Sequence, residues 1–206
     1  KPIRIGTRES ALALWQAQTL QNLLKKKGFK TELVPIKSTG DLDLNQPLYE
    51  MGTTGIFTKT LDTALLNDRI DLAIHSMKDV PTLLAEGIQQ AAVLTRGPVL
   101  DVIVKKSKSD LNNSSTIATG SLRRKAQWLA KYPNHTIVPL RGNIQTRLKK
   151  LQEGAWEGAV FAEAALDRLK VNEDNVEVLD WMLPAPAQGA LMIVCKSNDL
   201  ELFNIL

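Results

Sequence analysis

Residues 184–195 read Pro-Ala-Pro-Ala-Gln-Gly-Ala-Leu-Met-Ile-Val-Cys, a proline-rich linker followed by an apolar run as long as one strand. A single strand cannot bury its own apolar side chains, so it has to join a sheet formed earlier in the chain. We therefore expect the chain to cross twice between two α/β domains, near residues 95–100 and again near 185–190. Two such domains would leave a ligand-binding cleft between them.

Before this linker, strand patterns alternate with helix patterns, which favours parallel strands joined by right-handed crossovers. A polar, glycine-containing stretch over residues 38–55 is expected to be a long functional loop. The fold class is therefore α/β. The expected strands are residues 3–5, 33–36, 72–74, 102–104, 116–119, 136–140 and 159–161. The expected helices are one capped by Ser10 that ends near Gly28, and 57–65, 121–131 and 143–151.

The composition is that of a soluble globular protein. Of 206 residues, 44% are hydrophobic and 23% are charged, which argues against collagen, coiled-coil and disordered classes. No uncharged apolar run approaches the ~20 residues that span a bilayer, and residues 1–5 lack the apolar core of a signal peptide. One cysteine and two histidines do not suffice for a structural zinc site. We expect a cytoplasmic monomer with no metal and no membrane partner.

The charge balance favours an anionic partner. Lysine and arginine number 26 against 22 acidic residues, a net charge of +4. Only 5% of residues are aromatic, so the stacking platforms of single-strand nucleic-acid binders are not evident. The chain also has no P-loop and no G-x-G-x-x-G motif. These features predict a small anionic ligand and no nucleic acid.

Basic and hydroxyl side chains follow four of the expected strands. In open α/β sheets, ligands bind beyond the carboxyl ends of the strands, where helix N-termini attract anions. Arginine pairs bidentately with carboxylates and phosphates, so this edge predicts a ligand with several anionic groups. The residues placed there are Arg8, Ser10, Lys78, Thr119, Ser121, Arg123, Arg124, Arg141, Gly142, Asn143 and Arg147.

Several of these residues also have a structural interpretation. Arg123 and Arg124 would suit a solvated helix face, although cations at a helix N-terminus oppose its dipole. His75 is expected to be a buried supporting histidine, and Cys195 a small buried apolar residue. Asp79 either pairs with a neighbour or acts as the acid/base group, since we expect only it and Glu9 as carboxylates at this edge.

Five motifs resemble the porphobilinogen deaminase (hydroxymethylbilane synthase) family. They read RIGTRES at 4–10, ALWQ at 13–16, HSMKDVP at 75–81, SLRR at 121–124, and LRGN at 140–143 followed by TRL at 146–148. The resemblance implies two lobes of type II periplasmic-binding-protein-like architecture with a double crossover. Domain 1 would be residues 1–97 plus 190–206, and domain 2 residues 98–189. The family's third, cofactor-bearing domain is absent from this chain, which alone is expected to be inactive.

The resemblance also implies a chemistry. The family is a transferase of haem biosynthesis that releases ammonia and joins four porphobilinogen molecules into hydroxymethylbilane. Its dipyrromethane cofactor is tethered to a cysteine, expected in the missing domain and not at Cys195. Asp79 would contact the pyrrole nitrogens and stabilise the cation formed when ammonia leaves. Cofactor and substrate would be held by Arg8, Ser10, Lys59, Lys78, Thr119, Ser121, Arg123, Arg124, Arg141, Gly142, Asn143, Arg147 and Gln188.

The sequence departs from the family pattern in places. Gly52-Thr53-Thr54-Gly55 lacks the lysine that the family commonly carries in this motif, and Ala165 and Ala187 replace usual glycines. The alternative function is a carboxylate-binding receptor or effector domain of the same fold. Consumption of porphobilinogen, as opposed to binding of an unchanged carboxylate, separates the two.

Overall fold

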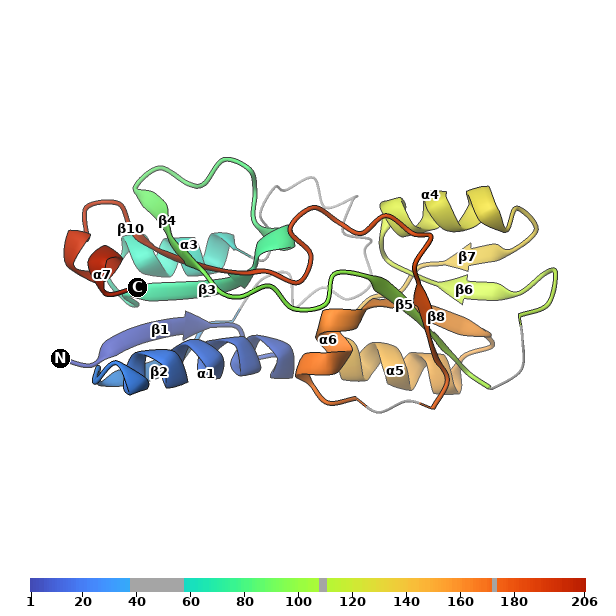
Figure 1. Cartoon of the computed structure of the whole chain (residues 1–206), viewed down its shortest axis with the longest axis horizontal. Coiled ribbons are helices and arrows are strands. Elements are labelled where there is room, and N and C mark those ends of the chain that lie inside the picture. The colour runs from blue at the N-terminus through green and yellow to red at the C-terminus, as the bar shows by residue number, and fades with distance from the viewer. Residues whose placement is uncertain (38–57, 108–110, 172–173) are drawn as a thin grey trace. The chain divides into compact units, whose positions relative to one another are not determined.

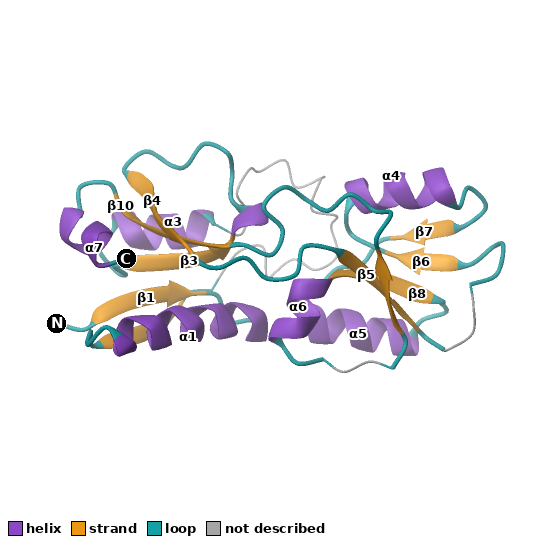
Figure 2. Ribbon diagram, in the orientation of Figure 1, coloured by secondary structure: helices purple, strands orange, loops and turns teal. Residues whose placement is uncertain are grey.

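The computed structural model describes residues 1–37, 58–107, 111–171 and 174–206. Within these ranges the chain forms two α/β units, each built on its own five-stranded sheet (Figures 1 and 2). The first unit contains residues 1–37, 58–97 and 189–206, and the second contains the described residues from Pro98 to Gln188. Two α/β lobes are thus confirmed. The expected loop over 38–55 lies outside the described residues.

The sheet of the first unit has the strand order β2-β1-β3-β10-β4. Strand β1 runs parallel to β2 and β3, whereas β10 runs antiparallel to β3 and β4. The strands are β1 (Ile3–Thr7), β2 (Thr31–Pro35), β3 (Leu72–Ser76), β4 (Ile88–Val93) and β10 (Leu191–Lys196). The helices are α1 (Ala11–Lys26), α3 (Lys59–Leu66), the single 3₁₀ turn η2 (Met77–Asp79) and α7 (Leu200–Ile205).

Strand β10 is the apolar run that follows the linker, and it lies inside the first sheet between β3 and β4. Side chains of a strand point alternately to the two faces. Leu191, Ile193 and Cys195 accordingly pack in one cluster with residues of α1, while Met192 and Val194 pack in a second cluster with residues of α3. Because both faces are covered, the strand is apolar at five successive positions, residues 191–195, instead of at every second one.

The sheet of the second unit has the strand order β7-β6-β8-β5-β9. Strand β6 runs parallel to β7 and β8, and β5 runs antiparallel to β8 and β9. The strands are β5 (Asp101–Lys105), β6 (Thr116–Ala118), β7 (Thr136–Val138), β8 (Gly158–Ala162) and β9 (Val176–Leu179). The helices are α4 (Leu122–Lys131), α5 (Ile144–Glu153) and α6 (Glu163–Arg168).

Side-chain caps set the starts of α1, α4 and α5, and Asp199 likewise caps α7. The Oγ of Ser10 accepts a hydrogen bond from the backbone N of Ala13 at 3.3 Å, which starts α1 where the sequence indicated. Ser121 caps α4 through Arg124 N at 3.4 Å, and Asn143 caps α5 through its side-chain oxygen. Such caps satisfy N–H groups that have no partner inside the helix.

The expected parallel pairing is present among β1, β2 and β3 and among β6, β7 and β8, but each sheet also has antiparallel pairs. Strands β10 and β5 each enter their sheet antiparallel, because each directly follows a segment that passes from one unit to the other. Strand β4 and strand β9 were not expected at all. Both lie at a sheet edge, and β4 (Ile-Gln-Gln-Ala-Ala-Val) shows no strict apolar alternation. The short helices α6 and α7 give too few turns for a periodic signal.

The packing of β10 makes a stability prediction. Ile193 is fully buried and pairs with Ile74 and Ala92 on the two neighbouring strands. Ile193→Ala should lower the free energy of unfolding by about 3 kcal/mol, since it leaves a cavity in the core. Leu83→Ala, at a side chain that is 86% exposed, should change it by less than about 0.5 kcal/mol. If both variants lost the same free energy of unfolding in urea titrations, the central position of β10 would be contradicted.

Candidate functional site

The candidate residues of the first unit lie where β1 and β3 end. These strands are parallel neighbours, so Arg8 and the turn η2 come at the same edge of the sheet. Gln16, on α1, donates from Nε2 to the Oγ of Ser76 at 2.8 Å and so links α1 to the end of β3.

Asp79 is exposed at the end of η2, and Lys78 beside it is partly buried. Lys59 is an exposed residue at the start of α3, and Ser10 is occupied as a cap.

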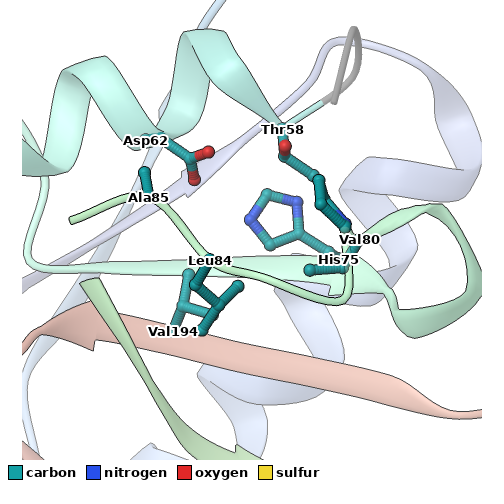
Figure 3. A pocket seen from close by; sticks show the side chains of 8 residues that line it. Thr58, Asp62, His75, Val80, Leu84, Ala85 and Val194 are labelled. Carbon is teal, nitrogen blue, oxygen red and sulfur yellow. The ribbon is translucent and has the colours of Figure 1, made fainter. Parts of the chain in front are cut away.

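His75 lies directly below this turn, on β3. It is buried, and its Nε2 has no hydrogen-bond partner among the described residues. Burial, reinforced by the positive charge of Arg8, lowers its pKa to about 4. Figure 3 shows the ring in a small pocket that is also lined by Thr58 and Asp62. His75 is therefore neutral near pH 7, in the buried position that the sequence indicated.

Asp62 gives this pocket its second titratable group. Its carboxyl lies on α3 and is half-buried, and this burial raises its pKa, although a hydrogen bond with Thr58 opposes the shift. The other lining side chains are apolar and include Val80, Leu84 and Val194 (Figure 3). The pocket thus supports the η2 turn from the core side and is not part of the exposed basic edge.

The candidate residues of the second unit lie where β6 and β7 end. The two strands are parallel neighbours, and each leads into a helix whose N-terminus lies at this edge. Thr119 is buried, and the turns touch at Gly120, where a Cβ would lie 2.6 Å from the carbonyl oxygen of Leu140. Gly142 has φ +113°, a backbone conformation that favours glycine. Small residues therefore bring two helix N-termini together, an arrangement that attracts anions.

Arginines surround these two helix starts. Arg141 is only 7% exposed, and its carbonyl oxygen accepts from Lys150 Nζ at 3.3 Å. Arg147, one turn into α5, donates from Nε to the carbonyl oxygen of Gly142 at 2.7 Å. Asn143 is exposed and serves as the helix cap. Hydrogen bonds to the backbone thus hold the turn after β7 and orient Arg147.

Arg123 and Arg124 are paired with a carboxylate of the protein. Arg123 Nη2 lies 2.6 Å from Asp101 Oδ2, and Arg124 Nη2 lies 2.7 Å from Asp101 Oδ1. Arg124 also donates from Nη1 to the carbonyl oxygen of Val160 at 3.0 Å. Burial alone would raise the pKa of Asp101, but Arg124, Arg123 and Gln188 together hold it below its ordinary value.

Asp101 corrects the expectation that Asp79 and Glu9 are the only carboxylates at the basic edge. We looked for site residues just after each strand. Asp101 is instead the first residue of β5, and because β5 is antiparallel to β8 it pairs with Ala162, the last residue of β8. An antiparallel strand thus brings its first residue to the edge where parallel strands end. A carboxylate directly before the apolar Val102-Ile103-Val104 run was the signal in the sequence.

Gln188 is completely buried within the same network. Its Nε2 donates to the carbonyl oxygen of Val99 at 2.7 Å, to that of Leu100 at 3.2 Å and to Asp101 Oδ1 at 2.9 Å. These contacts tie the residues just before β5 to the end of the 184–188 linker segment. They give Gln188 a structural role, and the ligand contact that the resemblance implied stays a prediction.

The site residues are therefore gathered in two sets, one in each unit. The first set has the exposed carboxylate Asp79 with basic neighbours, and the second has paired helix N-termini with several arginines. Within the described ranges, no three His, Cys, Asp or Glu side chains come together as metal ligands would. The donors of the second set suit a ligand that carries several carboxylates.

The fold is that of type II periplasmic-binding-protein-like domains. An arginine transport-system periplasmic binding protein from Legionella pneumophila covers 99% of this chain and 90% of its own, with a TM-score of 0.54 and 11% identity. An ancestral arginine-binding protein bound to glutamine covers 99% of this chain and 88% of its own, with a TM-score of 0.53 and 15% identity. At such low identity these similarities establish the fold alone.

Sequence comparison identifies the family. A family model described as "Porphobilinogen deaminase, dipyromethane cofactor binding domain" matches residues 3–204. A relative from Methanocaldococcus jannaschii, named "Probable porphobilinogen deaminase", is 47% identical over 208 residues, which cover 99% of this chain and 70% of the relative. The chloroplastic porphobilinogen deaminase of Oryza sativa is 46% identical, and the match covers 99% of this chain and 60% of that relative. The chain belongs to the porphobilinogen deaminase family.

Family membership places the chain among the enzymes of tetrapyrrole biosynthesis and associates it with the dipyrromethane cofactor. The chain spans between 60% and 70% of the length of the relatives from M. jannaschii, O. sativa and L. pneumophila strain Paris. Dipyrromethane carries acetate and propionate side chains. The arginines and helix N-termini of the second unit are suitable donors for those carboxylates.

Burial of His75 predicts a pH dependence of stability. The folded-state pKa of about 4 lies below the ordinary value of 6.5, so protonation favours the unfolded chain. The stabilisation is complete above about pH 6.5 and declines as the pH falls towards 4, by up to about 3 kcal/mol. His75→Gln, which cannot titrate in this range, should lose less stability over the same interval. Identical pH profiles of the two proteins in urea unfolding would contradict this assignment.

Proposed function

We propose that this chain supplies the substrate- and cofactor-binding units of an enzyme that deaminates porphobilinogen and joins four molecules of it into hydroxymethylbilane. The observation that carries the proposal is the pair of helix N-termini at Ser121 and Asn143, surrounded by arginines. Each pyrrole of the substrate bears two carboxylates. A fixed group of positive donors would hold them without reorganising during the reaction.

In the proposed reaction the arginines bind and orient, and Asp79 acts on the reacting ring. Arg8, Lys78, Arg141 and Arg147 would hold acetate and propionate groups. When bound, dipyrromethane supplies the pyrrole carbon to which the first substrate is joined. The carbon–nitrogen bond of the protonated aminomethyl group of the substrate would break, and ammonia would leave with the bonding electrons. The methylene carbon would then bond to the acceptor pyrrole carbon, whose proton would be lost to solvent. The carboxylate of Asp79 would accept a hydrogen bond from the pyrrole N–H and stabilise the resulting positive charge.

The position of Asp79 supports this role. It is exposed at the end of the η2 turn, where a ligand can reach it, and the hydrogen bond from Gln16 to Ser76 holds the preceding strand end in place. Its neighbours Lys78 and Arg8 are cationic, and they would attract the substrate carboxylates to the same edge. With these cations paired to substrate carboxylates, the charge of Asp79 would be left to stabilise the positive charge that develops on the ring.

We propose that the cofactor is tethered to a cysteine other than Cys195. Cys195 is completely buried in β10, and burial raises the pKa of its thiol. A buried, protonated thiol is a poor nucleophile. We therefore propose that Cys195 does not carry the cofactor, and that the whole enzyme works as a cytoplasmic monomer binding neither nucleic acid nor membranes. None of the described helices is both long and apolar enough to cross a bilayer.

The role of Asp79 predicts the effect of removing its charge. In the full-length enzyme, Asp79→Asn keeps the side-chain volume but should reduce kcat at least about 100-fold, because the developing cation loses its counter-charge. Asp180→Asn, at another exposed position, should leave kcat unchanged. Hydroxymethylbilane formation in a stopped assay measures both. Near-normal turnover of the Asp79 variant would refute the proposed role.

The buried state of Cys195 predicts that it does not carry the cofactor. Cys195→Ala in the full-length enzyme should retain the dipyrromethane mass increment, because the tether lies elsewhere. Intact-protein mass spectrometry, followed by peptide mapping, measures the increment and locates it. A dipyrrole attached to Cys195 in the unsubstituted enzyme would overturn this assignment.

A further inference from the structure

We propose that Asp101 is a positioning residue for ligand binding, which holds the guanidinium of Arg123 in place to receive a ligand carboxylate. This inference rests on the proposed function of the second unit. Asp101 is the first residue of β5, and its carboxylate binds Arg123 through one oxygen and Arg124 through the other. The same carboxylate accepts from Gln188, so its own orientation is fixed from a third side.

The two arginines differ in solvent exposure, and this difference indicates different roles. The side chain of Asp101 is 0% exposed and that of Arg124 is 8% exposed, whereas that of Arg123 is 26% exposed. Arg124 also donates to Val160 within the sheet, so it acts as a buried support. Arg123 is the member of the group that a ligand can reach from solvent.

The charges leave a surplus for a ligand. Two guanidinium groups face one carboxylate, so Arg123, Arg124 and Asp101 together carry a net charge of +1. Both arginines also lie in the first turn of α4, where the helix dipole repels cations. Asp101 offsets this repulsion only in part. A ligand carboxylate at Arg123 would neutralise the remaining charge.

The contacts around Arg123 also restrict its side chain before a ligand binds, so binding costs less conformational entropy. Its Nη1 donates to the carbonyl oxygen of Leu183, and Gln127 contacts the same carbonyl at 3.1 Å. Arginine loses considerable rotamer freedom when it is fixed, and here that loss occurs on folding. A guanidinium fixed before the ligand arrives binds it more tightly than a mobile one.

The competing interpretation is an ion pair that serves stability alone. The two interpretations differ in one measurable respect. A positioning residue acts through Arg123, so its effect on KM disappears once Arg123 is replaced. A structural residue lowers Tm and leaves KM unchanged in an enzyme that is still folded. A double-mutant cycle separates these effects.

The experiment compares Asp101→Asn in the full-length enzyme with and without Arg123→Leu, and measures KM for porphobilinogen, kcat and Tm. We expect Asp101→Asn to raise KM about tenfold when Arg123 is present and less than about twofold when it is replaced. Asp71→Asn, which breaks the partly exposed pair with Arg4, is the matched control and should leave KM unchanged. An unchanged KM for Asp101→Asn, or an equal rise in both backgrounds, would overturn the inference.

Gln188→Leu keeps the inference testable if Asp101→Asn does not fold. It removes the hydrogen bond to Asp101, together with those to the carbonyl oxygens of Val99 and Leu100, and leaves all three charges in place. We expect a KM increase of about threefold, again only when Arg123 is present. No increase would overturn the inference. Absence of turnover in the unsubstituted full-length enzyme would instead overturn the proposed function, and this inference with it.

Discussion

The buried carboxylate of Asp101 is the interaction on which the second unit depends. Burying a charge is costly unless it is paired and hydrogen-bonded, and Asp101 has two arginines and an amide as partners. These contacts hold the start of β5, the first turn of α4 and the residues around Gln188. All three segments belong to the edge that carries the candidate ligand donors. Removing this one charge would leave two guanidinium groups without their counter-ion in a largely buried environment.

The first unit depends in a similar way on β10. This strand comes from the far end of the chain, yet it separates β3 from β4 in the sheet and contributes to both apolar clusters. The end of β3 carries η2 and therefore Asp79. Through pairs such as Leu191 with Ser76, β10 contacts the last residue before that turn. The proposed acid/base group thus stands on a strand whose position depends on a segment more than a hundred residues away.

The sequence predicted the parallel strands of the fold well, for a physical reason. Buried strands such as β3 and β8 are short apolar runs, and the helices after β1, β6 and β7 begin at the side-chain caps Ser10, Ser121 and Asn143. Both are local signals. Antiparallel entry of a strand depends instead on where the chain returns from, which no local pattern encodes. Asp101 was missed for that reason.

The most direct test of this account is a crystal structure of the full-length enzyme with dipyrromethane bound. The account predicts that carboxylates of the ligand contact Arg123 and the turns at Ser121 and Asn143, while both oxygens of Asp101 remain on their arginines. It also predicts that the carboxylate of Asp79 faces a pyrrole nitrogen. A ligand that makes no contact with this edge of the second unit, or one that displaces Asp101 from Arg123, would contradict the account.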